Sequence, residues 1–169
     1  MKYISAMRKM SKRKKEIEKN KKHITLILSG GAITGIFNHL AFLQAWNELK
    51  MNKLYHIDRI IGTSAGALVG SMYSNNKTNP TKIFNTFLDS ISYWDLLKSI
   101  KFNSINIFKS YYFVFTKKIY SILKNNLPYN FNQLNTKFAC ISTNIQNGKY
   151  KIFKRNSNLP KKVLSSMTL

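Results

Sequence analysis

Short apolar runs, each followed by a glycine-rich turn and a helical pattern, organise the first half of the chain. Residues 23–28 and 57–61 are short, β-branched and apolar, which predicts two strands. Between them, apolar residues recur at helical spacing over 36–50. A strand, a helix and a second strand in this order predict two parallel strands joined by a right-handed crossover.

The second half of the chain has weaker patterns. Asn147-Gly148 is a strong hairpin signal between two strand-like runs. Residues 111–123, rich in Tyr and Phe with lysines at their fringe, fit either a helix or a strand. The remaining predicted elements are helices over 80–97 and 161–167 and strands over 137–143 and 149–154.

The composition allows one domain with a hydrophobic core, since the chain has 169 residues of which 44% are hydrophobic. The formal net charge of +22 and the pI of about 10.2 favour anionic partners, either phospholipid surfaces or nucleic acid. Lys, Asn and Ile are frequent everywhere, however, and an AT-rich coding sequence produces the same bias. The single Cys140 cannot form an internal disulfide, which fits a reducing compartment.

Residues 1–22 predict a basic tail in front of a domain over 23–169. The tail lacks the apolar region of a secretory signal, and no stretch of the chain is apolar for long enough to span a bilayer. A solvated tail is the preferred interpretation. A tether to anionic membranes and a nuclear address are the alternatives.

The candidate nucleophile lies in Gly62-Thr63-Ser64-Ala65-Gly66, directly after the second strand. A serine presented at the tip of a strand needs a tight, strained turn, and glycines two before and two after it avoid collisions of Cβ atoms. The N-terminus of the following helix favours a developing anion near Ser64. The structural alternative is an ordinary strand–helix turn with a capping serine.

The first turn, Gly30-Gly31-Ala32, leaves backbone N–H groups that can face a phosphate or an oxyanion. A dinucleotide-binding fingerprint is the competing interpretation, because Gly30, Ala32 and Gly35 nearly match its glycines and Asp58 its acidic residue. The match is poor, since Ala32 replaces the middle glycine. Asp58 also opens the second strand, whereas a ribose-binding acid would close it.

Together the two turns resemble the patatin-like phospholipase family, whose paired glycine motifs match residues 28–35 and 62–67. The resemblance implies an α/β fold with three layers (α/β/α) and a mainly parallel central sheet. It implies lipid acyl hydrolysis by a Ser–Asp dyad without a cofactor or a metal. It assigns the nucleophile to Ser64 and the oxyanion hole to the backbone of Gly30, Gly31 and Ala32.

The same resemblance implies a phospholipid or other acyl-ester substrate and an anionic membrane surface as partner, rather than nucleic acid. We expect an intracellular, cytoplasmic protein that is peripheral at membranes. Two positions depart from the family pattern. Ala32 stands where a third glycine is usual, and Thr34 stands where Lys or Arg is usual. Alanine still donates its N–H but lacks the backbone freedom of glycine.

The sequence offers no evident base for Ser64. A Ser–acid–His order is excluded, because all three histidines precede Ser64: His23, His39 and His56. The acids after it, Asp89 and Asp95, fall in the predicted helix over 80–97, where solvated positions are expected. The dyad aspartate of the family lies in an Asp-Gly turn, which the chain lacks, so the resemblance breaks off before that residue. We therefore expect a truncated domain with impaired acyl hydrolysis. A non-catalytic, basic lipid- or nucleic-acid-binding fragment is the alternative.

Overall fold

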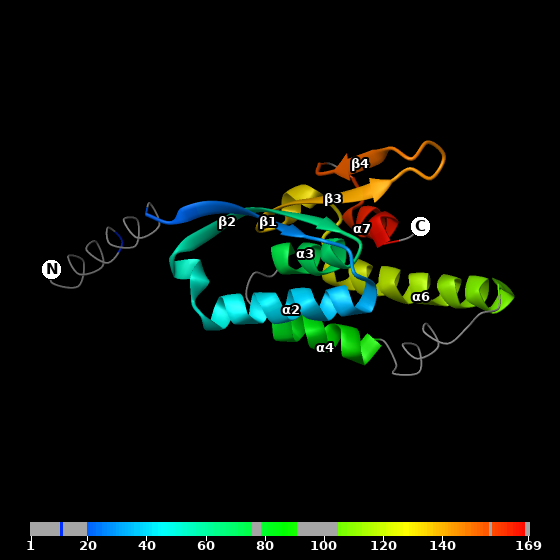
Figure 1. Ribbon diagram of the computed structural model, residues 1–169, viewed down its shortest axis with the longest axis horizontal. Helices are drawn as coiled ribbons and strands as arrows, with labels where there is room; N and C mark the ends of the chain where they lie inside the picture. Colours follow the sequence, from blue (N-terminus) through cyan, green and yellow to red (C-terminus); the bar gives the residue numbers. More distant parts are fainter. Residues whose placement is uncertain (1–10, 12–19, 76–78, 91–104, 156, 168–169) are drawn as a thin grey trace.

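A four-stranded sheet forms the frame of the protein in the computed structural model, which describes residues 11, 20–75, 79–90, 105–155 and 157–167 (Figure 1). The strand order is β1-β2-β3-β4, with β1, β2 and β3 parallel and β4 antiparallel to β3. The strands are β1 (Lys22–Leu28), β2 (Tyr55–Thr63), β3 (Lys137–Thr143) and β4 (Tyr150–Phe153). The helices are α2 (Ala32–Glu48), α3 (Ala65–Asn75), α4 (Pro80–Ser90), α6 (Ile105–Asn126) and α7 (Leu159–Met167), with short 3-10 turns η1 (Met51–Lys53) and η2 (Phe131–Gln133).

The β1–α2–β2 unit has the predicted arrangement of two parallel strands joined by a helix. Leu28, the last residue of β1, pairs with Gly62 near the end of β2. Parallel strands finish at the same edge of a sheet. The two glycine-containing turns that follow these strands therefore lie at one edge, although they are separated by about thirty residues of chain.

Helix α3 is buried on every side, since all residues from Ala65 to Ser74 are buried. Small side chains make this burial possible. A Cβ added at Gly70, for example, would lie 3.0 Å from the Ile60 side chain and 3.2 Å from that of Phe138. A helix that is covered all round needs neighbours on each side. In this protein α3 contacts β1, β2 and β3 as well as α2, α4 and α7.

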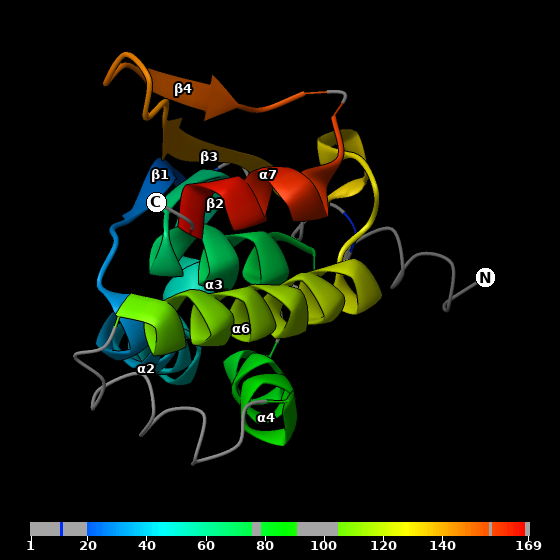
Figure 2. The ribbon, with the colours of Figure 1, turned by 90° about the vertical axis from the view of Figure 1, so that its right-hand side faces the viewer.

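The described helices lie on one side of the sheet (Figures 1 and 2). Alternate strand residues point towards them and are buried, among them Leu28 on β1, Ile60 on β2 and Cys140 on β3. The opposite face carries exposed apolar side chains, with Ile27 73% and Ile152 49% exposed. The α/β fold class with a mainly parallel sheet is confirmed. The second helical layer that would complete three layers stays a prediction.

The second half of the chain decides one open choice and contains the predicted hairpin. Residues 111–123, predicted as either helix or strand, belong to the helix α6. The predicted hairpin is present: Gly148 adopts φ +65° and its N–H donates to the Asn144 carbonyl over 2.8 Å. Helix α4 follows the predicted start at Pro80, and its predicted extension over 91–97 lies outside the described residues.

The basic tail predicted for residues 1–22 also lies largely outside the described residues. β1 begins at Lys22, one residue before the predicted start of the domain. The division between tail and domain therefore stays a prediction.

Candidate active site

Ser64 lies in a strained turn between the end of β2 and the start of α3. Its φ is +52°, in the left-handed region that costs a residue with a side chain roughly 1–2 kcal/mol. The Ser64 carbonyl accepts hydrogen bonds from the N–H groups of Ala67 (2.9 Å) and Leu68 (3.1 Å). Helix α3 therefore starts immediately at the serine. This is the backbone geometry that presents a nucleophile at the tip of a strand.

Two glycines let the strand and the helix close around Ser64. A Cβ at Gly62 would lie 2.4 Å from the Gly66 carbonyl oxygen and 2.6 Å from the Ala67 Cα. A Cβ at Gly66 would lie 2.1 Å from the carbonyl oxygen of Leu28, at the end of β1. These distances are shorter than any real Cβ contact. Gly66 also donates its N–H to the Ser29 carbonyl over 3.1 Å, which ties the two turns together.

The first glycine-rich turn lies directly beside the Ser64 side chain. An added Cβ at Gly30 would be 3.6 Å from the Ser64 Cβ. Gly31 must be glycine, because a Cβ there would lie 2.9 Å from the Gly35 Cα. This turn leads into α2. The turn around Ser64 (residues 62–66), which we call the elbow, leads into α3. The N-termini of both helices therefore lie at this edge of the sheet (Figure 1). Helix N-termini carry N–H groups and a partial positive charge that favour an anion.

The two departures from the family pattern have visible structural consequences. Ala32 adopts φ +49°, so the alanine takes the left-handed backbone conformation, which is unfavourable for a residue with a Cβ. The Thr34 hydroxyl donates to the Gly31 carbonyl over 2.8 Å. Thr34 therefore braces the turn through a local hydrogen bond, whereas the usual Lys or Arg would supply a positive charge.

A second serine, Ser166, contacts the backbone of Ser64. The Ser64 N–H donates to the Ser166 Oγ over 3.0 Å. The Ser166 hydroxyl in turn donates to the carbonyl of Ile141 on β3. Between the neighbouring residues of the same two elements, the Ser142 hydroxyl donates to the Ser165 carbonyl over 2.6 Å. In the sequence, Ser165 and Ser166 resemble the start of a Ser-containing motif of the family, but the sequence does not say which residues they meet.

His39 is connected to this site through the Ser29 carbonyl. Its Nε2 lies 2.8 Å from the Ser29 carbonyl oxygen, the same oxygen that accepts from the Gly66 N–H. A protonated Nε2 donates to that oxygen. His39 therefore supports the first turn, and the sequence reasoning that dismissed the histidines by chain order missed this contact.

Asp58 takes no part in this site. It lies at a register irregularity in β2, where its Oδ1 is 2.9 Å from the His23 Nδ1 and 3.6 Å from the His56 Nε2. The hydrogen bond from His23 is the main cause that lowers the pKa of Asp58. Ser64 is six residues further along the chain, about 20 Å at strand spacing. Asp58 therefore does not lie beside the first glycine-rich turn, because it pairs with His23 towards the other end of the strands. This argues against a dinucleotide-binding site.

Of the two acids that follow Ser64, the structure describes one. Asp89 is exposed in the last turn of α4, and Asp95 lies outside the described residues. No group of three or more His, Cys, Asp or Glu side chains that could hold a metal ion occurs within the described part of the chain.

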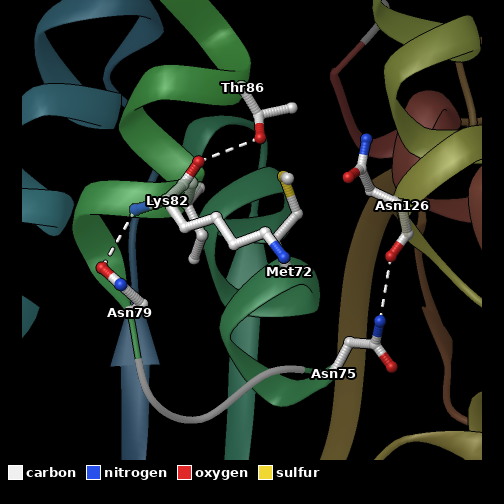
Figure 3. A pocket seen from close by; sticks show the side chains of 7 residues that line it. Met72, Asn75, Asn79, Lys82, Thr86 and Asn126 are labelled. Carbon is white, nitrogen blue, oxygen red and sulfur yellow. Dashed lines mark hydrogen bonds between the residues drawn. The ribbon is translucent and has the colours of Figure 1, made fainter.

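Two hollows flank α4, and neither contains Ser64. The polar one, of about 230 Å³, lies between α3, α4 and α6 and is lined by Met72, Asn75, Asn79, Lys82, Ile83, Thr86 and Asn126. Figure 3 shows Asn75 and Asn126 on one side of it and Asn79, Lys82 and Thr86 on the other. Asn75 ends α3, about 15 Å from the elbow at helical rise. The apolar one, of about 340 Å³, lies between α2 and α4 and is lined by Phe37, Leu40, Ala41, Gln44, Pro80, Thr81 and Phe84.

Comparison with known proteins adds one finding to this geometry. The family model described as patatin-like phospholipase matches residues 26–166, which is well over half of the chain. The matched range includes both glycine-containing turns, the strained serine and Ser166. A search of curated proteins found no match.

Proposed function

Because the chain belongs to the patatin-like phospholipase family, whose members are lipid acyl hydrolases, we propose that Ser64 is the nucleophile of an acyl-ester hydrolase acting at membrane surfaces. One observation carries the proposal. Ser64 stands at φ +52° on the tip of β2, beside the first glycine-rich turn, where a Cβ added at Gly30 would lie 3.6 Å from the Ser64 Cβ. An ordinary capping serine needs neither the strain nor a second turn of this kind beside it.

In the proposed reaction, the Ser64 Oγ attacks the ester carbonyl carbon while a base takes the hydroxyl proton. The carbonyl oxygen becomes an oxyanion, which the N–H groups around Gly30, Gly31 and Ala32 and the N-termini of α2 and α3 stabilise. The tetrahedral intermediate expels the alcohol, which takes up a proton, and leaves the acyl group on Ser64. Water then attacks this ester and releases the fatty acid.

No residue has yet been assigned as the base that takes the Ser64 proton. A serine hydroxyl is a weak nucleophile without a group to take its proton, and we propose a carboxylate for that part. The chain has no histidine after Ser64 and no Asp-Gly turn, so the 169-residue chain should hydrolyse esters slowly. In serine proteases stripped of catalytic residues, the oxyanion hole and substrate binding alone leave roughly 10³–10⁴ over water. A version extended through an Asp-Gly turn should be much faster. Equal rates would place the base within the chain, with Asp89 and Asp95 as the first candidates.

A membrane surface is proposed as the place of action on the basis of charge. The chain carries a formal net charge of +22, and lysines near an anionic membrane contribute about 1 kcal/mol each. None of the helices in the described ranges is long and apolar enough to cross a bilayer. Binding to liposomes should rise with the fraction of anionic lipid, fall with salt and weaken when residues 1–22 are deleted. Equal binding to neutral and anionic liposomes would contradict docking and leave compositional bias as the explanation.

Labelling with a fluorophosphonate tests the nucleophile directly. The Ser64 Oγ should displace fluoride from phosphorus, so that wild-type protein gains one adduct per chain and Ser64→Ala gains none. Ser121→Ala, which removes an exposed hydroxyl on α6, is the matched control and should be labelled like wild type. A wild-type protein that stays unlabelled but binds anionic liposomes or nucleic acid would favour the non-catalytic alternative.

A further inference from the structure

The Ser166 hydroxyl both accepts and donates a hydrogen bond next to the proposed nucleophile. Its oxygen accepts the Ser64 N–H over 3.0 Å, and its hydrogen is donated to the Ile141 carbonyl. The two partners belong to different elements, the elbow after β2 and the strand β3. One side chain therefore links the strained turn to the neighbouring strand, across 102 residues of chain.

The helix that carries Ser166 is held firmly against the sheet. Leu159 and Val163 of α7 are fully buried, and α7 contacts both α3 and β3. The last carbonyls of a helix lack partners within it. The Ser142 hydroxyl satisfies one of them by donating to the Ser165 carbonyl over 2.6 Å. The end of α7 is thus joined to the end of β3 by a second hydrogen bond, which does not involve Ser166 or Ser64.

The Ser64 N–H needs such an acceptor because of the elbow geometry. Ser64 lies between the last strand residue and the first helix residue, so its N–H has no regular partner in either element. A partly buried N–H without an acceptor is unfavourable, and so is a positive φ at serine. A hydroxyl that accepts this N–H stabilises the strained conformation. The bond also occupies the Ser64 N–H, so the oxyanion must be met by other N–H groups.

We infer that Ser166 is a positioning residue, whose hydroxyl holds the Ser64 backbone so that the Ser64 Oγ stays aimed at the substrate carbonyl. This inference rests on the proposed function, since it assigns Ser166 a part in the reactivity of Ser64. A misplacement of about 1 Å at a reacting group can cost about 10²-fold in rate. Loss of the hydroxyl should therefore slow the attack by Ser64 about 10- to 100-fold while leaving probe binding unchanged.

The test uses two readouts on the full chain, one of which does not need catalysis. The first is amide hydrogen exchange at Ser64, which reports the bond to Ser166. The second is the rate of fluorophosphonate labelling, separated into the maximal rate and the probe concentration at half-maximal rate. Ser166→Ala should accelerate exchange at Ser64 and lower the maximal labelling rate 10- to 100-fold. Ser166→Thr, which keeps a hydroxyl, should restore both.

Two matched variants separate positioning from general loosening of α7. The Ser165 hydroxyl donates only within its own helix, to the Lys162 carbonyl over 2.9 Å, so Ser165→Ala should behave like wild type. Ser142→Ala removes a side-chain hydrogen bond between β3 and α7 that does not involve Ser64. It should lower thermal stability without a 10-fold loss in the maximal labelling rate.

Two results for Ser166→Ala would overturn the inference, and one result for wild-type protein would overturn the proposed function. Unchanged exchange at Ser64 in Ser166→Ala would overturn the inference, because the bond would then not hold the turn. Faster exchange with unchanged labelling would also overturn it, since the bond would be structural only. If wild-type protein is not labelled at all, the proposed function fails. The exchange data then show separately whether the bond between Ser64 and Ser166 exists.

Discussion

Replacing Gly66 by alanine tests whether the close approach of α3 to β1 fixes the elbow. The added methyl group would lie 2.1 Å from the Leu28 carbonyl oxygen, 2.4 Å from the Leu28 carbonyl carbon and 2.7 Å from the Ser29 carbonyl oxygen. All three are backbone atoms, so no side chain can rotate away. The helix must move away from the end of β1, and the 3.1 Å hydrogen bond from the Gly66 N–H to Ser29 must lengthen or break.

The expected change in the free energy of unfolding combines two destabilising effects and one stabilising effect. Overpacking costs about 1–3 kcal/mol, and loss of a hydrogen bond costs about 0.5–1.5 kcal/mol. Alanine is favoured over glycine within a helix by about 1 kcal/mol, which acts in the other direction. The free energy of unfolding should therefore fall by about 2 kcal/mol. For a domain of this size, this corresponds to a drop of roughly 4–8 °C in melting temperature.

Urea unfolding followed by circular dichroism measures the change, and Gly30→Ala is the matched control. An added Cβ at Gly30 would meet only the Ser64 Cβ at 3.6 Å and the Thr63 carbonyl oxygen at 4.0 Å, which are ordinary contacts. Its free energy of unfolding should stay within about 0.5 kcal/mol of wild type. If Gly66→Ala were as stable as wild type or more stable, helix propensity would outweigh the clash, and the explanation of the glycine spacing would be wrong.

Two further predictions concern strain and burial. Ala32→Gly should raise the free energy of unfolding by about 0.5 kcal/mol in urea titrations. Glycine removes the cost of φ +49°, but its greater freedom in the unfolded chain offsets part of this gain. A loss of stability would contradict strain at this position. The Cys140 thiol should not react with Ellman's reagent in native protein at pH 8 and should react fully in guanidinium, because it is fully buried and its burial raises its pKa to about 12. Reaction of the native protein at the rate of the unfolded chain would contradict that burial.

Local features of the sequence determined the elements that surround the site. The apolar run ending at Leu28 and the run ending at Ile61 predicted two strands, and the spacing of Gly62, Ser64 and Gly66 predicted the strained elbow between a strand and a helix. These features depend on propensity, periodicity and steric limits within a few residues, so they can be read from the chain alone. The family resemblance rests on the same local motifs, and the family match over residues 26–166 agrees with it.

Only the tertiary structure decided which distant residues meet at that elbow. Ser166 lies 102 residues from Ser64, and His39 meets the Ser29 carbonyl across a turn and part of a helix. Asp58 looked like a partner of the first glycine-rich turn by its spacing, but it pairs with His23 towards the other end of the strands. The physical reason is the same in each case. Hydrogen bonds between elements depend on sheet order, register and helix docking, and none of these leaves a periodic signal in the residues that take part.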